Sequence, residues 1–138
     1  MHARVPNMTK SWYMRELAKD KGRLEDIVEY SSNVLSIVEA VDFEHFENDI
    51  LVYYSTMKNV EIVGEAAYML TKEFKAEHPE IPWKQVEGMR HVLVHGHSQV
   101  LPRILWNTAK QDIPAIKIQA EKYLNDIDWD NYLDTKNR

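Results

Sequence analysis

The chain has 138 residues, which suits one folded domain and leaves little room for a second. Hydrophobic residues make up 44% and charged residues 28% of it, the proportions of a soluble globular protein, which excludes a disordered tail protein. The formal net charge of −5 provides no general attraction to nucleic acid, so contact with RNA would need a local basic patch or a cleft.

The sequence contains no cysteine, which excludes disulfides and thiolate metal sites and is compatible with a reducing cytoplasm. No apolar run approaches the roughly 18 residues of a membrane span, and no signal-peptide core is present, so we expect a cytoplasmic protein without membrane contact. Only 4 glycines and 5 prolines interrupt runs rich in helix-forming residues. This predicts an all-α fold, an antiparallel bundle of about four to five helices with two long helices first.

Residues 1–11 are polar without a period, and we expect a flexible N-terminal tail over residues 1–13 before a single helical domain over residues 14–130. The sequence turns helical from Tyr13, and apolar positions that recur at every third or fourth residue from Leu24 to Val41 predict the first long helix, with Gly22 interrupting its start. The last residues, 131–138, are polar and predict a loose C-terminal tail.

A second long helix is predicted over residues 44–77, with Asp42 as its N-cap and His45 at the third helical position. Two neighbouring hydrophobic stripes run along it, so it should be covered on two sides. We expect it to be the central helix, either inside a bundle or shared between two subunits.

The prolines Pro79 and Pro82 break this helix, because proline lacks an amide donor and forces the preceding residue out of the helical region. A third helix should begin at Trp83 and end near His95, with Gly96 as the left-handed residue after it.

The remaining helices are predicted from prolines near their first turns. A short one should run from Pro102 through Trp106, and the last should follow an N-cap at Asp112, with Pro114 in its first turn.

The stretch from Glu87 to His97 carries most of the chemistry, because it places Arg90 and His95 near the end of the third helix. Histidine exchanges protons near neutral pH, and arginine offers a permanent positive fork that fits phosphate oxygens. These are the functions of a metal-free ribonuclease. Five positions along a helix turn a side chain by about 140°, so the pair would meet only at a frayed helix end or across a two-fold dimer.

Metal binding is the competing interpretation of the same stretch. His91 and His95 lie four residues apart on one helix face, and His97 follows closely. No carboxylate stands at a recognised ligand spacing nearby, so we expect no metal.

Structural roles compete with the catalytic ones. Arg90 could form a surface ion pair with Glu87 or Glu61, and His95 could bind the last carbonyl groups of its helix. Glu65 lies between hydrophobic stripes, where a carboxylate needs a partner, so it is either the mate of an arginine or part of a polar site. Trp83 is expected to be a core anchor.

Several short segments occur in a characteristic order: Ile62-Val63-Gly64-Glu65-Ala66, Ile81-Pro82-Trp83, Gly88-Met89-Arg90, Leu93-Val94-His95-Gly96, Leu105-Trp106 and Asp112-Ile113-Pro114. In this order they resemble the HEPN family, and within it the HepT-like toxins of two-component toxin–antitoxin modules. The resemblance covers most of the chain from about Arg23 onward. The spacing of Arg90 and His95 is weak evidence alone, but its combination with the other segments is specific.

This resemblance implies an all-α bundle that forms a homodimer, with Arg90 and His95 of both subunits lining a cleft. It implies a metal-independent endoribonuclease without a cofactor that cleaves cellular RNA, with no DNA substrate expected. It also implies a partner, a minimal nucleotidyltransferase antitoxin. In the family, a tyrosine follows two residues after the histidine, and the antitoxin adds AMP groups to it.

The chain departs from the family pattern at two positions. The residue after Arg90, often asparagine in the family, is His91, and the tyrosine position is occupied by His97. Histidine has no phenolic oxygen, so the usual modification cannot form there, although blocking by simple binding can. Two hypotheses follow: an active endoribonuclease with His91, His97 and Glu65 as supporting groups, or an inactive dimer that binds a nucleotide or RNA and serves as partner of the nucleotidyltransferase.

Overall fold

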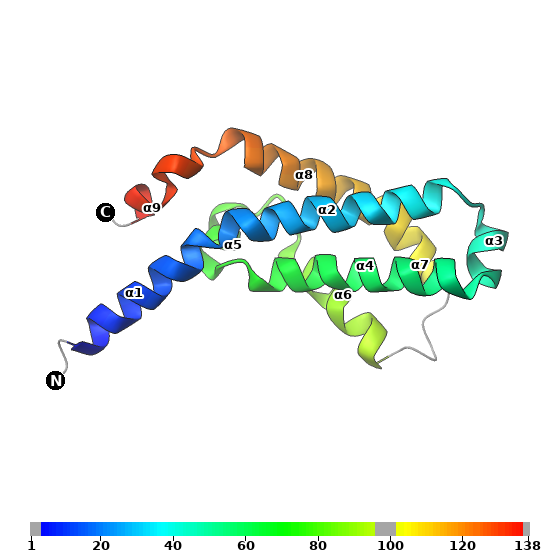
Figure 1. Cartoon of the computed structure of the whole chain (residues 1–138), viewed down its shortest axis with the longest axis horizontal. Helices are drawn as coiled ribbons and strands as arrows, with labels where there is room; N and C mark the ends of the chain where they lie inside the picture. The colour runs from blue at the N-terminus through cyan, green and yellow to red at the C-terminus, as the bar shows by residue number, and fades with distance from the viewer. Residues whose placement is uncertain (1–3, 96–101, 137–138) are drawn as a thin grey trace.

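The computed structural model describes residues 4–95 and 102–136, and within them the side chains of residues 10–91 and 102–136. This part of the chain contains helices and no strand, which confirms the predicted all-α class (Figure 1). No helix within it is long and apolar enough to cross a bilayer. The elements are α1 (Arg4–Ala18), α2 (Asp20–Glu39), α3 (Phe43–Asn48), α4 (Ile50–Met69), α5 (Lys72–Glu77), α6 (Trp83–His95), α7 (Pro102–Asn107), a π-helical turn (Thr108–Asp112), α8 (Ile113–Asp126), a 3-10 turn (Trp129–Asn131) and α9 (Tyr132–Lys136).

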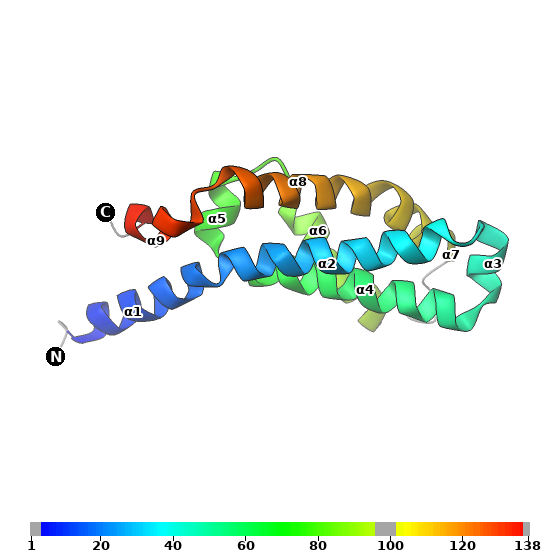
Figure 2. The same ribbon diagram turned by 45° about the horizontal axis from the view of Figure 1, so that its top comes forward.

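The helix α4 is the centre of the bundle, as the sequence predicted. It packs along α2 on one side and against α6 on the other, and α8 covers α2 (Figures 1 and 2). The core between these helices is built from fully buried aliphatic side chains, among them Ile27, Val34, Val63 and Ile113. The helix α4 is therefore covered on two sides, but Ile62 and Met69, from one of its two hydrophobic stripes, are not buried.

Both long helices predicted at the start of the chain are divided. The first begins at Arg4 rather than near Tyr13 and is interrupted at Lys19, between α1 and α2. In the second, Asp49 Oδ1 accepts hydrogen bonds from the first-turn amides of α4, and Thr71 Oγ1 accepts one from the Phe74 amide at 3.2 Å. Such capping starts a new helix, so the prediction of one uninterrupted helix over 44–77 was wrong.

Other helix boundaries are as predicted. Asp42 caps α3, since its Oδ1 accepts a hydrogen bond from the amide of His45 at 2.8 Å. The helix α6 begins at Trp83, which is buried and donates its indole N–H to the carbonyl oxygen of His78 at 2.7 Å. Trp83 is therefore the core anchor that was expected.

The predicted cap at Asp112 was wrong. Its side chain makes no capping hydrogen bond, and its backbone is already helical because the π-helical turn joins α7 to α8. The amide of Ile113 donates to the carbonyl oxygen of Thr108 within this wider turn. The wider turn accommodates Pro114, which has no amide to donate.

The first residue of α2, the cap of α5 and the C-terminal helix α9 meet at one buried carboxylate. Asp20 is fully buried and accepts hydrogen bonds from the Thr71 amide at 2.9 Å, the Thr71 hydroxyl at 2.7 Å and the Tyr132 hydroxyl at 2.9 Å. Burial raises the pKa of Asp20, and these three hydrogen bonds offset part of the rise. Tyr132 is buried as well, so the loose end predicted over 131–138 is corrected for residues 132–136, which form α9.

The substitution Tyr132→Phe is expected to lower the free energy of unfolding by about 1.5–3 kcal/mol at neutral pH, as for a hydrogen bond to a charged group. Because the folded-state pKa of Asp20 is raised, its ionisation costs stability as the pH rises through that pKa. Loss of the Tyr132 donor enlarges this cost, so the destabilisation should shrink when the pH falls below the pKa of Asp20. Urea denaturation at pH values above and below the pKa of Asp20 measures the effect.

The control is Tyr54→Phe, which removes a hydroxyl from an exposed ring of α4. It should change stability by less than about 0.5 kcal/mol. Equal destabilisation by both substitutions, or a Tyr132→Phe effect that does not vary with pH, would contradict the role given to Tyr132.

Candidate active site

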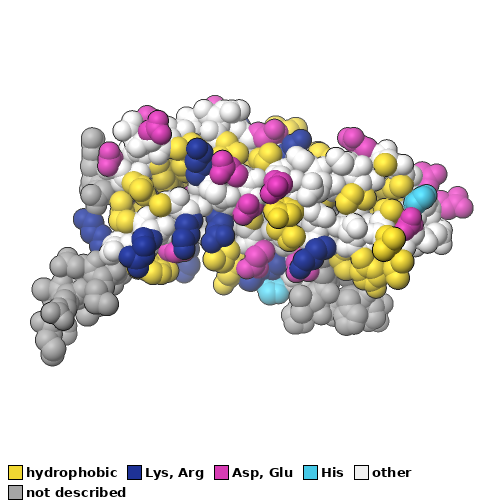
Figure 3. Space-filling view, viewed as in Figure 1, with side chains coloured by type: hydrophobic (Ala, Val, Ile, Leu, Met, Phe, Trp, Pro, Cys, Tyr) yellow, Lys and Arg dark blue, Asp and Glu magenta, His cyan; other side chains and the backbone are white. Residues whose placement is uncertain are grey.

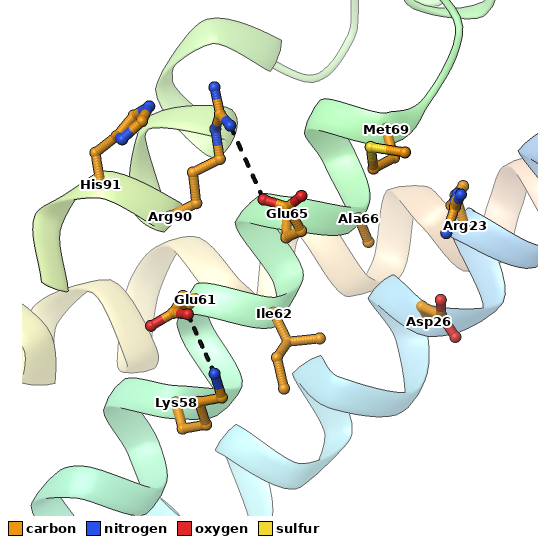
Figure 4. A pocket seen from close by; sticks show the side chains of 10 residues that line it. All are labelled: Arg23, Asp26, Lys58, Glu61, Ile62, Glu65, Ala66, Met69, Arg90 and His91. Carbon is orange, nitrogen blue, oxygen red and sulfur yellow. Dashed lines mark hydrogen bonds and ion pairs between the residues drawn. The ribbon is translucent and has the colours of Figure 1, made fainter. Parts of the chain in front are cut away.

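A groove of about 520 Å³ is formed by α2, α4 and α6 (Figure 4). Its apolar part consists of Ile62, Ala66 and Met69 of α4. Charged and polar side chains surround this part: Arg23 and Asp26 of α2, Lys58, Glu61 and Glu65 of α4, and Arg90 and His91 of α6. The groove therefore combines basic groups that can bind phosphate with carboxylates that keep its net charge low.

Arg90 is held at the rim of this groove by an aromatic ring. Its guanidinium carbon lies 3.4 Å from the ring centroid of Tyr68, and its Nη1 lies 3.9 Å from Oε2 of Glu65. Its Nε is buried and has no hydrogen-bond partner among the described residues. A long ion pair to a carboxylate that is 55% exposed contributes little. Stacking on Tyr68 therefore orients the guanidinium and leaves N–H groups for a ligand.

The two surface partners considered for Arg90 are occupied elsewhere, so that interpretation was wrong. Glu87 pairs with Lys75 at 2.8 Å, and Glu61 pairs with Lys58 at 3.2 Å. Glu65 is instead the carboxylate that faces Arg90, and it also lines the groove. The sequence suggested that Glu65 either pairs with an arginine or belongs to a polar site. In the structure its carboxylate faces an arginine and also lines the polar groove.

The position of Arg90 depends on a close approach of α6 to α4 at Gly64. A Cβ atom at Gly64 would lie 2.7 Å from the amide nitrogen of Arg90 and 3.0 Å from the carbonyl oxygen of Val86. Both distances are shorter than van der Waals contact, so only glycine fits between these backbones. This role was not predicted from the sequence, although a glycine inside a strong helical pattern was its signal.

Tyr68 and Arg23 were also missed. Tyr68 follows Glu65 by three residues and so lies on the same face of α4, which could have indicated it. Arg23 reaches the groove from α2, and its buried Nε has no hydrogen-bond partner within the described part of the chain. No local signal marked Arg23, because α2 and α6 are far apart in the sequence.

The structure describes the histidines of residues 87–97 to different extents. His91 is exposed and lines the groove. His95 is the last residue of α6, but its side chain lies outside the described residues, as does all of His97. The meeting of Arg90 with His95 therefore stays a prediction. Over the described residues, no three potential metal ligands gather, and a site that includes His97 lies outside them.

Comparison with known proteins gives the family context. The sequence model of the family described as "Ribonuclease HepT-like" matches residues 25–123. The curated protein "Probable ribonuclease HepT" of Thermococcus cleftensis is 38% identical over 102 residues, which cover 74% of this chain and 93% of that protein. "Putative RNase MJ1216" of Methanocaldococcus jannaschii is 34% identical over 108 residues, which cover 78% and 89%. No solved structure matches the chain.

The matched residues run from the first turns of α2 to near the end of α8. They include Gly64, Glu65 and Arg90, which bring α4 and α6 together at the groove, and they leave out α1 and α9. The family match covers most of the chain and includes the predicted site residues. On this evidence the chain belongs to the HepT-like ribonuclease family.

Proposed function

We propose that the protein is a metal-independent endoribonuclease toxin that cleaves cellular RNA as a homodimer. Arg90 stabilises the charge that develops on the phosphoryl group, and His95 exchanges the proton. The observation that carries this proposal is the guanidinium of Arg90, stacked on Tyr68 at the rim of a groove and on the helix that ends at His95. Membership in a ribonuclease family supports RNA as the substrate.

The proposed reaction uses the 2′-hydroxyl of the RNA itself as nucleophile. A neutral imidazole takes the proton of that hydroxyl while the 2′ oxygen forms a bond to phosphorus. The bond from phosphorus to the 5′ oxygen breaks, and an imidazolium returns a proton to this leaving oxygen. The products are a 2′,3′-cyclic phosphate and a free 5′-hydroxyl. Arg90 would bind the non-bridging oxygens, whose negative charge grows in the transition state.

A dimer supplies the geometry that one helix lacks. Arg90 and His95 lie on one continuous helix, where five positions correspond to about 140° around the axis. Within the described residues α6 packs mainly against α4, and Figure 1 shows it at the edge of the bundle. Two-fold pairing of α6 with its copy would bring Arg90 of one subunit toward His95 of the other.

Control by a nucleotidyltransferase antitoxin is the second part of the proposal. The position that carries the modified tyrosine in the family is His97 in this chain. We infer that the antitoxin acts here by binding rather than by O-linked modification, because an imidazole has no phenolic oxygen. The same departure favours the alternative function, an inactive dimer that binds a nucleotide or RNA and serves as partner of the nucleotidyltransferase.

Purified protein is expected to cleave single-stranded RNA in the presence of excess EDTA and to leave 2′,3′-cyclic phosphate ends. Arg90→Ala should lower the rate by about 10²–10³-fold, as when one transition-state donor is removed. Arg90→Lys should recover little, because an ammonium neither stacks on Tyr68 nor offers a bidentate fork. Electrophoresis of end-labelled RNA measures the rates, and sedimentation measures the dimer.

Expression of the protein alone in cells separates the two functions. Growth arrest that Arg90→Ala relieves supports the nuclease. A folded dimer that binds RNA or nucleotide, cleaves nothing and arrests no growth would overturn the nuclease and leave the partner function. Loss of cleavage on addition of EDTA would contradict metal independence.

A further inference from the structure

A second groove, of about 660 Å³, connects to the candidate site through Tyr68. It lies between α1, the junction of α4 with α5, and α6. Its aromatic side chains are Trp12 of α1, which is 56% exposed, and Tyr68 of α4, which is 45% exposed. Arg90 stacks on this same Tyr68, and Met69 lines both grooves, so the second groove is a neighbour of the site that holds the guanidinium. We call this space the Trp12 groove.

The wall that carries Trp12 lies outside the residues that the family model matches. The family match begins at residue 25, after α1 has ended. The helix is nevertheless fixed in place, because Leu17 is fully buried and the Tyr13 hydroxyl donates a hydrogen bond to Glu73 of α5. Lys136 of α9 pairs with the same Glu73 at 4.0 Å. The two ends of the chain thus build and hold this wall together.

Two of the carboxylates that line the Trp12 groove form close ion pairs. Glu87 pairs with Lys75 at 2.8 Å, and Glu16 pairs with Lys19 at 3.1 Å. Lys72 also lines the groove and forms no ion pair with the residues that the structure describes. The third lining carboxylate, Glu73, shares Lys136 with Glu77, so these pairs reduce the repulsion of an anion and Lys72 attracts one.

Basic side chains gather beside this groove, in contrast to the negative charge of the whole chain. On the face drawn in Figure 3, Lys and Arg side chains cluster where α1 meets α2. The sequence of this junction contains Lys10, Arg15, Lys19, Lys21 and Arg23. Within residues 10–23 the acidic residues are Glu16, which pairs with Lys19, and Asp20, which is fully buried; Glu25 and Asp26 follow on α2. This is the local basic patch that an acidic protein needs to attract a phosphate backbone.

We propose that the Trp12 groove is a nucleobase-binding subsite for single-stranded RNA, in which a base stacks on Trp12 while its neighbouring phosphate lies at Arg90. This inference rests on the proposed function and adds a substrate-binding residue from outside the matched family region. Base stacking on an exposed aromatic ring is tolerant of sequence and is a main source of affinity for single strands. The groove also has the size of ordinary small-ligand sites.

The test measures binding of two non-cleavable probes by fluorescence anisotropy. One is a short 2′-O-methyl oligouridine, and the other is the same backbone without bases. Trp12→Ala is expected to weaken binding of the first probe about tenfold, within the range measured for loss of one stacked base. It should leave binding of the abasic probe unchanged. Trp12→Phe, which retains an aromatic face, should recover most of the affinity.

The matched control is Tyr54→Ala, which removes an equally exposed ring, 53% exposed, from the other end of α4. It should leave binding of both probes unchanged. If Trp12→Ala bound the first probe with wild-type affinity, or lost affinity equally for both probes, the proposed subsite would be overturned. The nuclease proposal would be unaffected, because the cleavage assay tests it separately. Absence of RNA binding and cleavage in the wild type would overturn both proposals.

Discussion

Replacing His95 by alanine is expected to lower the rate of RNA cleavage by about 10²–10⁴-fold, the usual contribution of one general acid or base. The physical reason is that the 2′-hydroxyl is a poor nucleophile until a base removes its proton, and imidazole titrates near neutral pH. The helix α6 should persist, because His95 is its last residue and alanine is a good helix former. Single-turnover cleavage at saturating protein measures the chemical step.

The control for this prediction is His45→Ala, a partly exposed histidine of α3 that pairs with Asp49 at 2.9 Å. It should cleave at the wild-type rate. The pH–rate profile offers a second measurement, since the limb that belongs to the imidazole should disappear in His95→Ala. Full cleavage by a folded His95→Ala dimer would defeat the assignment.

Gly64→Ala is expected to destabilise the protein by about 1–3 kcal/mol, as for overpacking inside a dense core. The added methyl group would lie 2.7 Å from the amide nitrogen of Arg90, so α6 must move away from α4. We also expect slower RNA cleavage, because this movement displaces the guanidinium from Tyr68. Urea denaturation and the cleavage assay measure the two effects separately.

Gly22→Ala is the matched control, because a Cβ at Gly22 in α2 would meet no atom within 4 Å and α2 is not part of the proposed pairing of α6 with its copy. It should leave cleavage unchanged and raise helix stability by up to about 1 kcal/mol. If Gly64→Ala were as stable and as active as the wild type, the close approach would not be what places Arg90.

Patterns within one helix predicted much of the fold. The hydrophobic period located the core faces of α2, α4 and α8, and the prolines located the start of α6. The hydrophobic period alone did not reveal the breaks inside the second predicted helix, over residues 44–77. There, the side chains of Asp49 and Thr71 accept hydrogen bonds from the first-turn amides of α4 and α5, and a hydrophobic pattern does not record such a local competition.

The residue types of the site and their order along the chain were determined by the sequence alone, since Arg90 and His95 lie on one predicted helix and Glu65 and Gly64 on another. Only the tertiary structure decided that Arg90 stacks on Tyr68 rather than pairing with Glu87 or Glu61. The reason is that neighbours on one helix are fixed by its period, whereas contacts between helices depend on where they cross. That crossing is placed by a glycine in α4 that has no side chain to keep α6 away.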